Sequence, residues 1–127
     1  MRTDPLYEEV SPRLRHMSTS ELTAEDHLAQ ETLTQLVLTH MDDPNYEDFE
    51  TVSAEARLLE SQLALNLKVR DETVASELAR EVKRSGAPVT PQVEEMMRSI
   101  ANGTFGREID RLHDQLRMCR EKLASWR

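Results

Sequence analysis

The residues that could do chemistry are few, and the densest group of them is His40-Met41-Asp42-Asp43. An imidazole and two carboxylates can serve as ligands for a divalent cation. Side chains that are neighbours in sequence seldom converge on one point, however, and the chain has no second ligand pair at a metal-binding spacing. We interpret the group as the end of a helix followed by a solvated turn, and we expect no metal and no cofactor.

The segment Asn45-Tyr46-Glu47-Asp48-Phe49 is similar to the closing end of a calcium-binding EF-hand loop. If Glu47 is the last residue of such a loop, the first, third and fifth positions hold Leu36, Leu38 and His40. Calcium requires oxygen ligands at those positions and a glycine at the sixth, where this chain has Met41. The segment therefore does not predict a calcium site.

Cys119 is the single cysteine of the chain, and His113 precedes it by six residues. Residues at that spacing point to different faces of a helix, so the imidazole cannot activate the thiol. The sequence has no glycine-rich phosphate loop, no serine elbow and no paired metal motif. We therefore expect no catalytic residue, and the protein is not predicted to be an enzyme. A single cysteine also excludes an internal disulfide, which favours the cytoplasm.

The overall charge of the chain restricts the classes of molecule that it could bind. The 127 residues include 24 acids and 16 lysines and arginines, for a net charge of −8. This balance argues against bulk attraction to nucleic acid or to an anionic membrane. The longest run of large apolar residues, Leu36-Val37-Leu38, is too short to cross a membrane, and the first residues show no signal-peptide core. The scarcity of glycine and proline predicts long helices in a single domain.

The first part of the chain reads as two segments. Residues 1–22 contain two prolines and little apolar periodicity, so we expect a flexible N-terminal arm with at most one turn of helix. A single helical domain over 23–127 follows. Thr23 can cap a helix that covers about 24–41, and Asp42-Asp43-Pro44-Asn45 ends it.

A long central helix is predicted over about 46–84. Its apolar residues follow coiled-coil spacing and are then displaced after Asn66, which predicts a kink near residue 70. So long a stripe of apolar residues on one helix needs another helix to bury it. We expect a homo-oligomer that covers the first part of this stripe, namely Phe49, Val52, Leu59, Leu63 and Leu67. Ser85-Gly86-Ala87-Pro88 predicts a stop, Thr90-Pro91 a restart, and Asn102-Gly103 a break or hinge.

The last segment carries the most regular apolar pattern, which predicts a coiled-coil-like helix over about 105–126. Steps of four and three residues separate the members of this seam: Phe105, Ile109, Leu112, Leu116, Cys119, Leu123 and Trp126. The partner helix could belong to the same chain or to another. Basic residues flank the seam, and residues 47–60 are rich in acids. Antiparallel packing of the seam on that acidic segment would satisfy both patterns.

These features predict an all-α fold of three to four helices. The predicted function is a non-catalytic protein–protein interaction module, such as a small acidic adaptor, an assembly chaperone, an inhibitor or a complex subunit, that binds through the seam. The alternative is an oligomeric DNA-associated regulatory or packaging protein. It would use the basic residues toward the C-terminus: Arg98, Arg107, Arg111, Arg117, Arg120, Lys122 and Arg127. Nucleic acid is the less favoured partner because these residues encircle the helix, and no membrane partner is expected.

Overall fold

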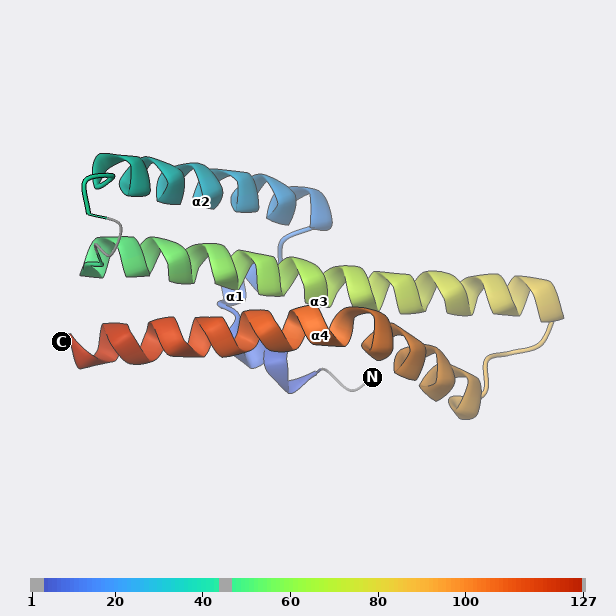
Figure 1. The fold of residues 1–127 in the computed structure, drawn as a ribbon. Helices are drawn as coiled ribbons and strands as arrows, with labels where there is room; N and C mark the ends of the chain where they lie inside the picture. The colour runs from blue at the N-terminus through green and yellow to red at the C-terminus, as the bar shows by residue number, and fades with distance from the viewer. Residues whose placement is uncertain (1–3, 44–46, 127) are drawn as a thin grey trace.

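The computed structural model describes residues 4–43 and 47–126, and within them it contains helices and no β-strand. The all-α prediction is confirmed. A 3₁₀ helix, η1 (Pro5–Glu9), precedes the α-helices α1 (Pro12–Arg15), α2 (Thr19–Thr39), α3 (Phe49–Ser85) and α4 (Pro91–Ser125). Figure 1 shows α2 and α4 on either side of α3, both antiparallel to it. No described helix combines the length and the apolar character needed to cross a membrane.

The ends of α3 and α4 follow from local capping. Asp48 accepts a hydrogen bond from the Thr51 amide at 2.8 Å and begins α3. Gly86 ends it with φ of 69°, a left-handed conformation that costs glycine nothing. Thr90 then caps α4, whose first residue is Pro91. The predicted stop and restart are confirmed, whereas the predicted start near residue 46 lies outside the described residues.

The start predicted for α2 is wrong, because the helix begins at Thr19 rather than near residue 24. Ser18 caps it and forms a capping box with Glu21, in which each side chain bonds the other residue's amide. The earlier start brings Leu22 and Glu25 into the interior. The carboxylate of Glu25 accepts from Arg13 at 2.9 Å, and this bond lowers the pKa of Glu25.

Both long helices run without interruption. Figure 1 shows α3 as one nearly straight helix over its described length, so the kink expected near residue 70 is absent. Helix α4 also continues through Asn102-Gly103, so the first of the two predicted alternatives, a break or a hinge, is wrong. It does bend in this region, where Figure 1 shows its first turns diverging from α3. The sequence of α4 includes Gly103 and Gly106, and glycine pairs are a common cause of helix bending.

The N-terminal segment packs against the long helices. Val10 and Leu14 are almost fully buried in the same core cluster as Leu63 and Leu116. The Lys68 ammonium donates to the Met17 carbonyl at 2.6 Å. The prediction of at most one turn of helix in this segment is wrong, because η1, α1 and the first residues of α2 lie within it. The flexibility of the arm stays a prediction, and the contacts above argue against it for residues 4–22. Residues 1–3 lie outside the described residues.

Candidate interaction surface

The seam lies inside the molecule, against α3. Ile109, Leu112, Leu116 and Cys119 are buried, Phe105 and Leu123 are half-buried, and Trp126 is 44% exposed at the end of the helix. The residues that α3 contributes to the same cluster include Val52, Leu59, Leu63 and Leu67. Of the two alternatives for the seam, the structure therefore favours the partner in the same chain. Its central side chains are not available to another protein.

The stripe predicted to drive oligomerisation is covered in the same way. Its members other than Phe49 are buried by the chain's own helices, and Phe49 is 50% exposed at the first turn of α3. This stripe gives no physical reason for a second copy to bind there. Any contact with another protein has to use a different surface.

The charges beside the seam fit the antiparallel packing of α4 on residues 47–60 that the sequence predicts. The structure confirms this prediction. Lys122 on α4 pairs with Glu47 at 2.6 Å, and this hydrogen bond raises the pKa of Lys122. Arg120 pairs with Glu9 at 2.8 Å and approaches Glu60 at 3.8 Å. The basic side of α4 therefore faces acids from two other parts of the chain.

Most of the other cations on α4 are paired along the helix itself. Arg98 pairs with Glu94 and Arg111 with Glu108, and the guanidinium of Arg117 lies 3.8 Å from Asp114. Arg107 forms no ion pair with any described residue, and Arg127 lies outside the described residues. These ion pairs neutralise much of the positive charge on α4 that binding to the phosphates of a nucleic acid would need.

The candidates for catalysis do not assemble. Cys119 is buried, and its burial raises the pKa of the thiol, which makes it a poor nucleophile. His113 is half-buried and lies on a different face of α4 from Cys119. In the part of the chain that the structure describes, no group of three or more His, Cys, Asp or Glu residues could hold a metal ion. The His40–Asp43 segment lies within this described part of the chain.

A polar cluster surrounds Arg70, whose guanidinium donates to Asp4 at 2.8 Å and pairs with Asp71 at 3.2 Å. The Tyr7 hydroxyl donates to Asp71, and its partial burial together with this bond raises the pKa of Tyr7. A pocket of about 520 Å³ opens beside the cluster, lined by Asp4, Pro5, Arg70, Asp71, Val74, Arg98 and Asn102. Because Arg70 is already held by two carboxylates, we interpret the cluster as a clamp that fastens η1 to α3.

The least covered part of the fold is the hairpin formed by residues 73–104, which we call the distal hairpin. Thr19 at the start of α2 donates to Glu72, and beyond this point Figure 1 shows α3 and α4 continuing without α2. Burial decreases toward the tip, from Val74 with 8% exposed to Val82 with 37% exposed. On α4, Met96 is 52% and Ile100 is 60% exposed.

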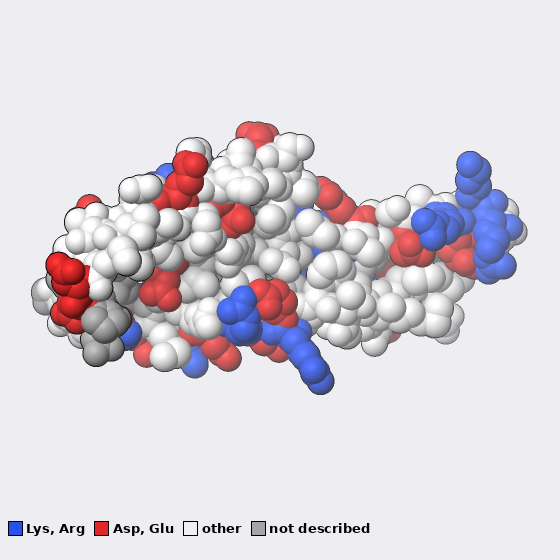
Figure 2. Space-filling model, turned by 45° about the horizontal axis from the view of Figure 1, so that its top comes forward, with Lys and Arg blue, Asp and Glu red and all other residues white. Residues whose placement is uncertain are grey.

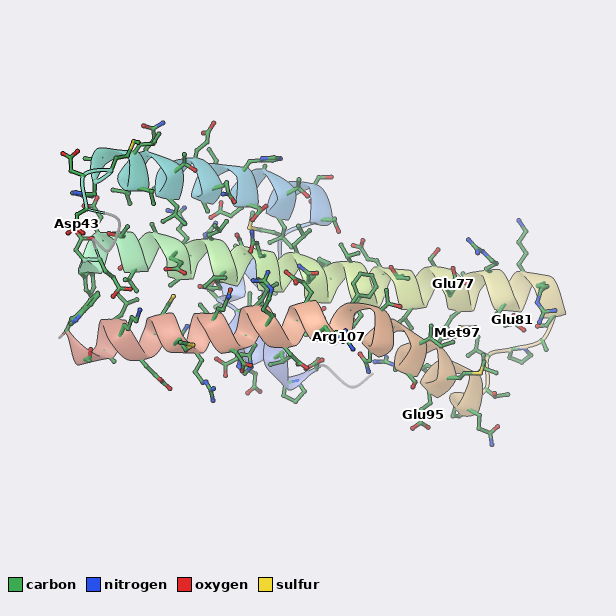
Figure 3. All side chains as sticks on the ribbon, viewed as in Figure 1. Asp43, Glu77, Glu81, Glu95, Met97 and Arg107 are labelled. Carbon is green, nitrogen blue, oxygen red and sulfur yellow. The ribbon has the colours of Figure 1, made fainter. Side chains whose placement is uncertain are left out.

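Charge is unevenly distributed on the distal hairpin. Figure 2 shows lysine and arginine gathered at its tip, beside a surface with few charged side chains. The basic residues there are Arg80, Lys83 and Arg84, all exposed. Figure 3 shows Glu77 and Glu81 on α3 and Met97 on the facing turns of α4, with Glu95 pointing away from α3. The hairpin thus combines exposed apolar side chains with a polar rim, as interaction surfaces do.

The predictions from the sequence do not include this surface, because they treat residues 91–102 only as a helix between two breaks. The signal was present, because Val93, Met96, Ile100 and Gly103 follow steps of three, four and three. A second exposed group, Val37, Leu38 and Met41 at the end of α2, borders residues 44–46, which lie outside the described residues.

No protein-family model, curated protein or solved structure matches this chain.

Proposed function

We propose that this protein is a non-catalytic protein–protein interaction module that binds through the distal hairpin rather than through the seam. The observation that carries the proposal is the exposure of Met96 and Ile100 on a pair of helices that no other described helix covers. Exposed apolar side chains that lie together, with polar residues around them, are typical of binding surfaces. The buried seam supports this role by holding α4 on α3 and projecting the hairpin away from the rest of the bundle.

Several observations favour binding over catalysis. The one thiol is buried with a raised pKa. The charged groups beside the 520 Å³ pocket are already in ion pairs, Arg70 with Asp4 and Asp71, and Arg98 with Glu94. The alternative of nucleic-acid binding is weakened by the ion pairs of Arg111, Arg117 and Arg120. The cytoplasm remains the proposed compartment because a lone cysteine fits a reducing environment.

Photo-cross-linking in cells that produce the full chain tests the proposal. A photoreactive amino acid replaces Met96 in one variant and Met118 in another. Both methionines lie on α4 and are equally exposed, at 52% and 56%, but Met118 is surrounded by polar residues. We expect a cross-linked product from position 96 that disappears when Ile100→Asp is added, and none from position 118. Equal cross-linking at both positions, or none at position 96, would contradict the proposal.

A further inference from the structure

Residues 4–15, which include η1 and α1 and which we call the strap, bind to α3 and α4 at the same time. Val10 and Leu14 of the strap are buried in the core cluster that also contains Leu63 of α3 and Leu116 of α4. The surface that the strap covers is the strap site. Its residues are Glu60, Leu63, Arg70, Asp71, Leu116 and Arg120.

Two arginines of the strap site bind the acids of the strap. Arg70 donates to the carboxylate of Asp4 at 2.8 Å. Arg120 donates to the carboxylate of Glu9 at 2.8 Å and to the backbone carbonyl of the same residue at 2.6 Å. The arginines come from α3 and α4, so the two long helices together bind a segment that carries an acid toward each end of η1.

Two acids of α3 accept hydrogen bonds from the strap between and beyond those arginines. Asp71 accepts from the Tyr7 hydroxyl, and Glu60 accepts from the Ser11 amide at 2.7 Å. The strap site therefore recognises charge, a phenol and the backbone, and it buries an aliphatic side chain beside them. This is the chemistry of a site for an acidic amphipathic segment.

The strap is held by these contacts rather than by its own helical structure. Helix η1 has five residues and α1 has four, and such short helices are not stable when detached. Val10 and Leu14 are its buried residues, and the ion pair of Glu9 with Arg120 is solvent-exposed and contributes little. The entropy cost of ordering the strap offsets much of what its contacts contribute. The strap can thus open while the seam stays packed on α3.

The described part of the strap leaves a neighbouring surface of α3 and α4 uncovered. The pocket of about 520 Å³ opens at Asp4 and Pro5, and α4 lines it with Arg98 and Asn102. Arg98 pairs with Glu94 along its own helix at 3.1 Å, and a partly exposed pair of this kind is weak. A segment that continues into the pocket with a further acid would find donors from both α4 residues.

We infer that the strap is an internal competitor for a docking site, and that this site binds an acidic amphipathic segment of another protein when the strap opens. The segment would carry acids for Arg70 and Arg120, an apolar side chain between them, and a further acid for Arg98. The strap lowers the apparent affinity for such a segment in proportion to the small fraction of molecules in which it is open. The strap site is separate from the distal hairpin, so the inference does not depend on the proposed function.

Fluorescence anisotropy with a labelled peptide of residues 1–15 tests the inference on full-length chains. Val10→Asp should open the strap, because a carboxylate in the apolar cluster destabilises the closed state. We expect the peptide to bind this variant at least about thirtyfold more tightly than it binds the wild type, because the strap site is then free. The peptide that itself carries Val10→Asp is the matched control and should bind neither chain. Circular dichroism should show no loss of helix beyond that of the strap.

Charge reversal and extension of the peptide test the recognition chemistry. Arg120→Glu, added to the Val10→Asp chain, should weaken binding severalfold, and a peptide with Glu9→Arg should restore it. A peptide with three glutamates before Asp4, in place of residues 1–3, should bind severalfold more tightly than the unaltered peptide. Arg98→Ala in the chain should remove that gain.

Equal affinities of the wild type and Val10→Asp for the peptide, or a charge swap that restores nothing, would overturn the inference. A loss of helix in Val10→Asp that exceeds the strap would do the same, because the strap would then be an inseparable part of the core. Added glutamates that bring no gain would remove the advantage that a segment of another protein needs over the strap. A wild-type dimer that exchanges straps, detected by light scattering, would make a second copy the occupant instead. Cross-linking through position 96 is unaffected by all of these results and tests the proposed function separately.

Discussion

Replacing Leu116 by alanine tests whether the seam holds the fold together. Leu116 is fully buried between α4 and α3, in a cluster that also contains Leu63 and Leu14. Leu116→Ala removes that burial and leaves a cavity that helices packed on two sides cannot easily close. The expected loss in the free energy of unfolding is about 2–5 kcal/mol. A domain of this size has a total stability of roughly 5–15 kcal/mol, so the loss is a large part of it.

Met118→Ala is the matched control. It also shortens a large apolar side chain on α4, but Met118 is 56% exposed, so the expected change is within about 0.5 kcal/mol. Urea unfolding followed by circular dichroism measures both variants. With a denaturant dependence of about 2 kcal/mol per molar, a loss of about 3 kcal/mol lowers the midpoint by about 1.5 M.

The difference between these two variants should survive tenfold dilution, because the lost contacts lie within one chain. Equal midpoints for Leu116→Ala and Met118→Ala would mean that the seam is not buried. A difference that vanishes on dilution would mean that the seam is buried between chains instead. Either result would refute the packing of α4 on α3 described above.

Three further predictions concern other parts of the fold. The Val10 amide, which donates to the Tyr7 carbonyl at 3.2 Å and belongs to a buried residue, should exchange slowly with deuterium; exchange at the rate of an unfolded chain would instead support a flexible arm. Glu25→Gln should cost about 1 kcal/mol above pH 4.5, the ordinary pKa of a glutamate. That difference should disappear as the pH falls through the lowered pKa of folded Glu25, and a pH-independent difference in urea midpoint would show that the charge is not responsible. Gly86→Ala should lower the free energy of unfolding by about 1 kcal/mol, because residue 86 has a positive φ. Gly106→Ala should raise the free energy of unfolding by about 0.5–1 kcal/mol, because residue 106 lies inside α4 with open space beside it. Thermal melts that shift in the same direction for both variants would contradict this assignment.

The sequence was most informative where a local rule determines the structure. The steps of the seam predicted its helix, and the acids of residues 47–60 predicted the direction in which it packs, as the pair Lys122–Glu47 bears out. Gly86 and Thr90 marked helix ends because a left-handed glycine and a hydroxyl cap act on their own neighbours. Ser18 and Glu21 are an equally local signal for the start of α2, whereas the predicted start was based on Thr23.

The features that the sequence did not predict depend on contacts between distant segments. Nothing in the spacing around Val10 and Leu14 indicates that two short helices fill the core beside α4. The polar run near Arg70 was interpreted as a kink, whereas it binds Asp4 from another segment and leaves α3 intact. The outward surface of α4 was missed because a pattern of apolar residues does not tell which of two faces a neighbouring helix will cover.

The burial of the N-terminal segment has a consequence for how the protein is made. Glu9 binds Arg120, 111 residues later, and Val10 shares the core with Leu112 and Leu116. A ribosome produces η1 and α1 first, but the site that they occupy is formed by α3 and α4 together and is complete only when most of α4 has been translated. Until then the early apolar residues and the face of α3 that receives α4 remain open to solvent, a condition that favours aggregation of nascent chains. Closure of this core therefore follows the translation of α3 rather than accompanying it. A chain that terminates before α4 keeps the residues that join η1 to α3 but lacks the helix that covers the apolar side chains of both.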